Sequence, residues 1–297
     1  MSGALWAAAS GVGFGAFQTV NRRAVARMDV YVATLVQLAV ALAALGVLLA
    51  ASSGERSRIG SLPWSASGWF VLGGITHFLI GWTFLNMSQQ RIGAARTSPL
   101  IATVPLFGAG VALVTLGEFP SALSWAGIVL ITLGAYVVAT DRLLRGASGA
   151  AMSWRDAVFG LACAVSWSIS PVFIRKGIED FDSPLLGVTI GLAASLAGYV
   201  LLLSLGGNRW ERDRLGDVVW LKILAGVLVA LSTWGRWVAL ERTSVGPVLA
   251  LSLMSVPVVL LLSPVLMGRE VERVDAYVWL GAALVIAGSL VLVLRGR

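Results

Sequence analysis

Charge is scarce in this sequence. Only 12% of the 297 residues are charged and the mean hydropathy is +0.87, whereas a soluble domain carries about 25% charged residues. A soluble core of this size could not hide an apolar content of 58%. The low charge therefore excludes an ordinary soluble globular protein.

The residue types that usually carry chemistry are also rare. Cys163 is the only cysteine, which excludes an intrachain disulfide, and His77 is the only histidine. The sequence contains no cysteine–histidine cluster, no HExxH motif and no glycine-rich phosphate-binding loop. We therefore expect neither a metal site nor a cofactor. No carboxylate lies in the middle of an apolar block, so a proton antiporter that works through a buried acid is not visible here.

Long apolar blocks of about 20 residues make up most of the chain, with charged residues in the gaps between them. About 20 helical residues, at 1.5 Å rise each, span the roughly 30 Å hydrocarbon core of a bilayer. Membrane β-strands would alternate over about 10 residues, and these blocks do not. The sequence predicts an all-α integral membrane protein with ten transmembrane helices, at residues 3–21, 30–51, 68–88, 94–115, 121–140, 156–174, 184–205, 217–240, 245–267 and 275–294.

The net charge is +7, from 22 basic residues of which only Lys176 and Lys222 are lysines. In a soluble chain this excess would suggest a nucleic-acid partner. In a membrane protein, basic residues flank the helices at the lipid headgroups, which is the position that we expect for them here. We predict the lipid bilayer and a small-molecule substrate as partners, and no nucleic acid. The sequence leaves the oligomeric state open.

The chain repeats itself at about half its length. WAGIVLITLG (125–134) returns as WLGAALVIAG (279–288), and a shift of 152 residues aligns further positions. These pairs are Trp82 with Trp234, Pro105 with Pro257, and Glu118 with Glu270. Each copy holds five blocks, an odd number, so the second copy must enter the membrane from the opposite side. We therefore predict two inverted five-helix repeats, 1–140 and 156–297, joined by a linker at 141–155. The paired glycines, two turns apart, predict a smooth face for close helix packing.

The repeated segments resemble a known family. GAARTSPLIATVPLFGAGVALVTLGE followed by WAGIVLITLGAYVV, and WVALERTSVGPVLALSLMSVPV with GRE and WLGAALVIAGSLVL, are similar to the two halves of an EamA-type protein of the drug/metabolite transporter superfamily. The resemblance covers nearly the whole chain. It implies a secondary transporter that moves a small metabolite by alternating access, with export of amino acids or related compounds as the expectation. Many relatives carry an arginine early in the second helix, near the position of Gln37 in this chain.

Two other classes of function stay open. The first is a non-transporting membrane scaffold or subunit, which would have no use for two-sided symmetry. The second, less favoured, is a membrane-embedded enzyme, which would usually need clustered carboxylates, histidines or cysteines. The resemblance implies a plasma-membrane protein with cytoplasmic termini. The basic residues contradict that orientation, because they are more numerous in the odd-numbered loops and so place both termini outside.

Two polar residues stand inside apolar blocks, His77 in the third and Arg236 in the eighth. After the shift of 152 residues, Arg236 aligns with Phe84 and His77 with Val229. Residues seven apart share one face of a helix, so both polar residues fall on corresponding faces of corresponding helices. This face predicts a pocket in which Arg236 favours an anionic substrate. The structural alternatives are that His77 bonds a neighbouring helix and that Arg236 extends to the headgroups.

Proline falls near the middle of the fourth and ninth blocks, at Pro105 and Pro257. Each removes one helical hydrogen bond and frees a carbonyl, and transporters offer such broken helices to substrates at the midplane. A packing kink without a function is the alternative. The remaining candidates for substrate binding are Phe14, Gln18, Thr103, Trp167, Ser170, Ser252 and Ser255. Coupling to a proton or to a counter-substrate is left open.

Overall fold

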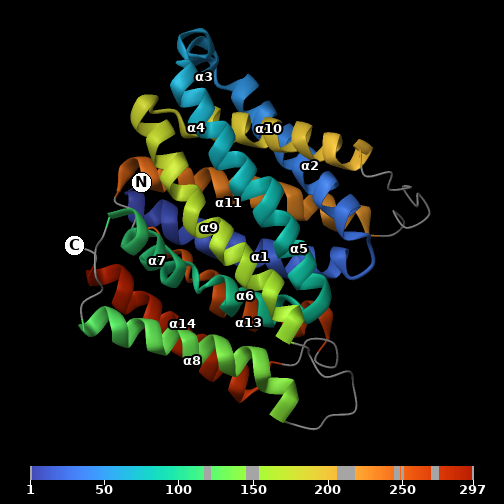
Figure 1. Cartoon of the computed structure of the whole chain (residues 1–297). Helices are drawn as coiled ribbons and strands as arrows, with labels where there is room; N and C mark the ends of the chain where they lie inside the picture. Colours follow the sequence, from blue (N-terminus) through green and yellow to red (C-terminus); the bar gives the residue numbers. More distant parts are fainter. Residues whose placement is uncertain are drawn as a thin grey trace.

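The computed structural model describes residues 2–116, 122–144, 154–205, 218–243, 248, 251–268 and 274–295. Helices and short connections account for these residues, which contain no strand (Figure 1). The elements are α1 (Gly3–Val25), α2 (Val30–Ala51), α3 (Ser53–Ser57), the short 3₁₀ turn η1 (Ile59–Ser61), α4 (Trp64–Gly74), the π-helical segment η2 (Ile75–Ile80), α5 (Gly81–Ile92), α6 (Ala94–Ile101), α7 (Val104–Leu116), α8 (Ala122–Leu144), α9 (Trp154–Asp180), α10 (Pro184–Leu205), α11 (Val219–Arg242), α13 (Ser255–Met267) and α14 (Ala276–Arg295).

Each of the ten predicted apolar blocks overlaps at least one described helix. Five of the described spans are long and apolar enough to cross a membrane, by length and composition: α2, the continuous α4–η2–α5 path, α9, α10 and α11. Shorter apolar helices occupy Trp125–Val138, Ser255–Met267 and Ala276–Val291. The all-helical membrane architecture thus agrees with the sequence, while the count of ten spans stays a prediction. Helix also extends into both ends of the predicted linker, because α8 continues to Leu144 and α9 begins at Trp154.

The helices of the two halves pack in matched pairs. α1 packs on α11 and α13, and α9 packs on α4–α5 and on α6–α7. Similarly α11 packs on α2, and α4 packs on α10. The sequence alignment makes α1 the counterpart of α9, α2 of α10, α4–α5 of α11, α6–α7 of α13, and α8 of α14. Each of these contacts between the halves therefore has its counterpart with the halves exchanged.

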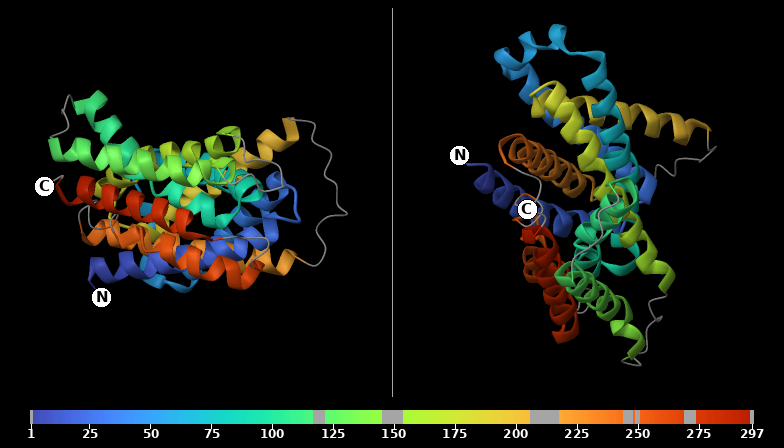
Figure 2. Two further views of the ribbon diagram at one scale, coloured as in Figure 1. Left: turned by 90° about the horizontal axis from the view of Figure 1, so that it is seen from below. Right: turned by 60° about the vertical axis from the view of Figure 1, so that its left-hand side comes forward.

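The fifth helices of the two predicted repeats, α8 and α14, lie side by side along one side of the molecule (Figures 1 and 2). A Cβ on Gly134 would lie 2.6 Å from the carbonyl oxygen of Gly281, and a Cβ on Gly288 would lie 2.6 Å from that of Gly127. The first glycine of each motif thus faces the second glycine of the other, so the two helices are antiparallel. Only glycine permits backbones to approach this closely, as the repeated motif predicted.

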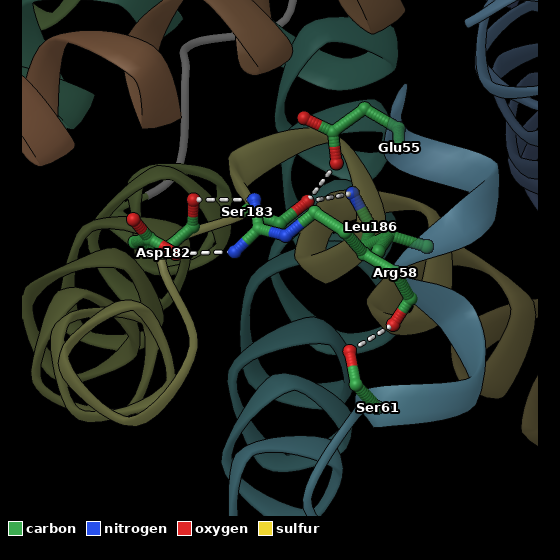
Figure 3. A network of polar contacts seen from close by, with 6 residues as sticks. All are labelled: Glu55, Arg58, Ser61, Asp182, Ser183 and Leu186. Atoms are coloured by element: carbon green, nitrogen blue, oxygen red, sulfur yellow. Dashed lines mark hydrogen bonds and ion pairs between the residues drawn. The ribbon is translucent and has the colours of Figure 1, made fainter. Parts of the chain in front are cut away.

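Polar contacts join the two halves at the end of the molecule where α9 ends (Figure 3). The hydroxyl of Ser183 donates to the carboxylate of Glu55, and the guanidinium of Arg58 donates to the carboxylate of Asp182. Arg58 also lies 4.6 Å from the ring centroid of Phe181. Glu55 and Arg58 belong to the connection between α2 and α4, and their partners to the connection between α9 and α10. This network therefore links the first half of the chain to the second.

Candidate functional site

The α4–η2–α5 path changes its helical geometry around His77. The π-helical segment Ile75–Ile80 interrupts the regular α-helical hydrogen bonds, so its carbonyls can accept from other donors. Two side chains of α9 donate hydrogen bonds to these carbonyls. Ser166 donates its hydroxyl to the carbonyl of Thr76, and the indole Nε1 of Trp167 donates to the carbonyl of His77 at 3.0 Å. These two hydrogen bonds attach the α4–η2–α5 path to α9.

His77 is buried in a cluster formed with α9 and α1. Its Nδ1 lies 2.9 Å from the hydroxyl of Ser170, and its ring stacks on Trp167 with centroids 5.0 Å apart. Phe14 packs edge-on against the same indole at 5.4 Å. Gly81 leaves room for the indole, because a Cβ there would lie 2.2 Å from Nε1. Three of the predicted candidates are thus in contact with His77 or with its stacking partner.

Two small adjoining cavities lie next to this cluster, with volumes of about 50 and 20 Å³. Both are lined by Phe14, Trp167, Arg236 and Ser252. The larger is also lined by Ser98, Ile101, Ala102, Val104, Pro105, Leu253 and Ser255, and the smaller by Ser10, Gly11, His77, Ser232 and Thr233. A small-molecule pocket usually measures about 300–1,000 Å³. In this conformation the cavities have room for a few waters only, so a substrate could enter only after helices separate.

Arg236 faces these cavities from α11. Within the part of the chain that the structure describes, its guanidinium makes no hydrogen bond and no ion pair. α1 and α11 are in close contact beside it, where the hydroxyl of Ser10 donates to the carbonyl of Ser232 at 2.6 Å. A Cβ on Gly13 would lie 2.6 Å from the Ser232 hydroxyl, so the small residue allows this approach. Arg236 therefore lines both cavities in this conformation, as predicted for a pocket residue.

Both proline-containing paths are broken beside the larger cavity. The first leaves helical geometry at residues 102–103, between α6 and α7, and the second at 253–254, just before α13. Each break shortly precedes a proline, Pro105 or Pro257, which matches the loss of one helical hydrogen bond at such a residue. Pro105 itself lines the cavity. Ala102 and Leu253, one residue from each break, line the larger cavity.

Phe84 lies elsewhere, which corrects its predicted position on the His77 face. It lines a separate cavity of about 530 Å³ between α2, α5 and α10. Its ring packs against that of Phe159, with the two ring centroids 6.3 Å apart. The prediction assumed a regular α-helix between residues 77 and 84. The π-helical segment adds one residue to the turn, which rotates the following side chains by roughly 100°.

Gln18 and Thr103 are not among the residues that line the two cavities. The hydroxyl of Thr103 is buried and donates to the carbonyl of Leu100 at 2.6 Å, within its own turn. The Nε2 of Gln18 lies 3.4 Å from the hydroxyl of Ser98, a residue that does line the larger cavity. The repeated Glu118 and Glu270 lie outside the described residues. In the described part, no group of three or more His, Cys, Asp and Glu side chains could hold a metal ion.

Sequence reasoning missed a polar cluster around Lys222. We expected this residue at the headgroups, but its side chain is fully buried. Its Nζ donates to the Oδ1 of Asn21 and, at 2.6 Å, to the Oε1 of Gln37, and lies 3.5 Å from the Oδ1 of Asn86. The available signal was the presence of several carboxamides inside or next to apolar blocks. Their meeting could not be read from spacing, because they belong to three different helices.

Comparison with known proteins gives one family. A model described as the EamA-like transporter family matches residues 1–140 and 154–294. Among the 25 matching chains of solved structures, one titled "Crystal structure of protein" is 20% identical, with 95% of each chain covered and a TM-score of 0.59. At that identity the likeness shows a shared fold alone. The comparison with curated proteins gave no match.

Proposed function

The chain belongs to the EamA-like transporter family, and we propose that it moves a small carboxylate-bearing metabolite across the plasma membrane by alternating access. Membership makes it a multi-pass membrane protein of the drug/metabolite transporter type. The substrates that we propose are amino acids or related compounds, and the proposed direction is export. The direction rests on the family resemblance, and the substrate class rests on the cavity.

Arg236 is the observation that carries the substrate class. An arginine at the centre of a membrane helix costs about 2.5–3.5 kcal/mol on insertion scales. Arg236 lies between the centre and the end of α11, where the cost is smaller, but polar groups inside membrane helices usually have partners. Arg236 borders the cavities without a hydrogen bond or ion pair among the described residues. A substrate carboxylate would supply charge-assisted hydrogen bonds to its guanidinium. This gain would offset the cost of the partly buried charge while the substrate is bound.

The other walls of the cavities support a substrate that also has an apolar part. Phe14 and Trp167 present aromatic surface beside Arg236, and His77 and Ser252 add polar groups at the edge. A ligand pocket usually combines apolar walls with a few placed polar groups in this way. A small amphipathic molecule with a carboxylate group fits this composition better than a strongly hydrated inorganic ion.

The packing of the halves supports alternating access. Contacts between helices recur with the halves exchanged, and the fifth helices pair antiparallel. Inverted repeats of this kind allow a central site to open to each side in turn. The small volume of the cavities fits a closed conformation between these openings.

The test is transport into proteoliposomes by wild type and Arg236→Gln, with amino acids and the matching amino-acid amides, in which an uncharged carboxamide replaces the carboxylate, as paired substrates. We expect Arg236→Gln to weaken the binding of carboxylate substrates by about 1–3 kcal/mol, which raises KM roughly 5- to 150-fold. The amount of folded protein should stay normal. The control is Arg242→Gln on the same helix, whose side chain is half exposed and lies outside the cavities. Transport at the wild-type rate and affinity by Arg236→Gln would contradict the assignment. Equal transport of acids and amides by wild type would contradict the substrate class.

A further inference from the structure

Lys222 lies at one end of the helix bundle, near the start of α11. Its three carboxamide neighbours come from the first half of the chain, Asn21 from α1, Gln37 from α2 and Asn86 from α5. An ammonium group has three donors, and this cage offers three neutral amide oxygens. No carboxylate contacts Lys222 within the described residues. A single side chain of the second half is thus held by three helices of the first.

A chain of carboxamides connects this cage to the larger central cavity. Asn21 donates to Gln89 at 2.7 Å, and the Nε2 of Gln89 lies 3.5 Å from the Oε1 of Gln18. Gln18 in turn lies 3.4 Å from the hydroxyl of Ser98, which lines the cavity beside Arg236. Hydrogen bonds between successive polar side chains therefore connect the wall of the larger cavity to the Lys222 cage.

The opposite end of the bundle is closed by apolar side chains. Phe70 of α4 is fully buried, and its ring centroid lies 6.0 Å from that of Trp237, near the end of α11. Gly177 of α9 and Gly187 of α10 make room for this ring, because a Cβ on either would lie within 2.6 Å of it. Lys222 and Trp237 are fifteen residues apart on α11, so roughly 22 Å separates the two ends.

Phe70 and Lys222 occupy equivalent positions in the two halves, because the shift of 152 residues that aligns Trp82 with Trp234 also aligns this pair. Their surroundings differ in the same sense. The equivalent of Asn86 at the same shift is Val238, and the equivalent of Asn21 is Ile174, at the shift of 153 that aligns Phe14 with Trp167 in the first helix of each half. Both are buried and apolar. The two ends of a pseudo-symmetric bundle are therefore closed by opposite chemistry.

We propose that the Lys222–carboxamide cage and the Phe70 cluster are the two gates of the translocation path, one polar and one apolar, at opposite ends of the central cavity. The inference rests on the proposed alternating-access transport. Opening the polar end removes the ammonium of Lys222 from its amide oxygens, and opening the apolar end withdraws Phe70 from the glycine-lined space. Because each gate holds only its own end shut, weakening one exposes the cavity to one side of the membrane.

The experiment measures access to the cavity from each side. Ser252→Cys, in a Cys163→Ala background, places a reporter thiol in the wall that both cavities share. A membrane-impermeant thiol reagent is applied to either side of sealed vesicles, and a separate Ser57→Cys protein identifies the side of the Phe70 end. Lys222→Met should raise the labelling rate about tenfold or more from the Lys222 side only. Phe70→Ala should do the same from the opposite side only.

The matched control is Lys176→Met, which changes the other lysine of the chain, located over the Trp69 ring at 4.6 Å. It should leave both labelling rates unchanged. If Lys222→Met does not accumulate as folded protein, Gln37→Leu removes one acceptor of the cage and should give the same one-sided increase at smaller size. Unchanged labelling in the cage and Phe70 variants, or an equal rise from both sides, would overturn the proposal. Labelling requires no substrate, so this outcome is separate from the Arg236→Gln transport result.

Discussion

At the scale of single residues, Trp167 connects most of the candidate site. Its indole stacks on His77, donates to the carbonyl of that residue, receives the edge of Phe14 and lines both cavities. The absence of a side chain at Gly81 makes this position of the indole accessible. A single methyl group at residue 81 should therefore disturb the site without touching a polar group.

We predict that Gly81→Ala weakens both folding and transport. The new Cβ would lie 2.2 Å from Nε1 of Trp167, so the indole must move and its hydrogen bond to His77 is lost. Overpacking of this kind costs about 1–3 kcal/mol. Gly68→Ala on the same membrane path is the control, since a Cβ there meets nothing within 4 Å, and it should be neutral or gain up to about 1 kcal/mol from helix propensity. Thermal unfolding in detergent and the KM for transport are the measurements, and equal behaviour of the two variants would refute the role of Gly81.

At the scale of elements, the π-helical segment and the two helix breaks determine which groups reach the cavity. η2 directs His77 towards Ser170 of α9, and Phe84 after it lines a different cavity. The breaks at 102–103 and 253–254 each contribute one residue, Ala102 and Leu253, to the wall of the larger cavity. α8 and α14, in contrast, are regular helices, and their glycines allow the two backbones to approach closely.

We predict that Gly281→Ala destabilises the protein by separating α8 from α14. Its Cβ would lie 2.8 Å from the carbonyl oxygen of Gly134 and 2.6 Å from a methyl group of Val138. We expect a loss of about 1–3 kcal/mol, seen as a lower melting temperature in detergent. Gly46→Ala in α2 meets nothing within 4 Å and should not lower the melting temperature. A Gly281→Ala protein as stable as the Gly46→Ala control would show that the close approach is dispensable.

At the scale of the whole molecule, the relation between the halves determines how the chain crosses the membrane. Family membership confirms the resemblance seen in the repeated motifs, and the family model matches the two halves separately. The antiparallel pairing of the equivalent helices α8 and α14 favours inverted halves. Orientation stays a prediction, because the basic residues of the loops and the family resemblance point to opposite sides.

The inverted arrangement predicts that equivalent loops of the two halves lie on opposite sides of the membrane. Ser57 lies in the connection between α2 and α4, and Asn208, outside the described residues, lies in the corresponding connection of the second half. Single cysteines at 57 and 208, in a Cys163→Ala background, should react with an impermeant reagent applied from opposite sides. Reaction of both from one side would exclude inverted repeats. The same assay, with the side known, also resolves the conflict over the location of the termini.

Sequence alone determined the features that depend on local composition and on repetition. The apolar blocks predicted helices because hydropathy and helix length are local properties, and the glycine motif predicted close packing because it occurs twice at one spacing. It also placed Arg236, Trp167 and Ser252 among the candidates, since polar and aromatic residues are conspicuous inside apolar blocks. Only the tertiary structure decided which side chains meet. Lys222 has partners on three helices of the other half, and the π-helical turn before Phe84 changed the face of that residue. Both outcomes depend on packing between distant segments, and the spacing of residues in the sequence does not predict such packing.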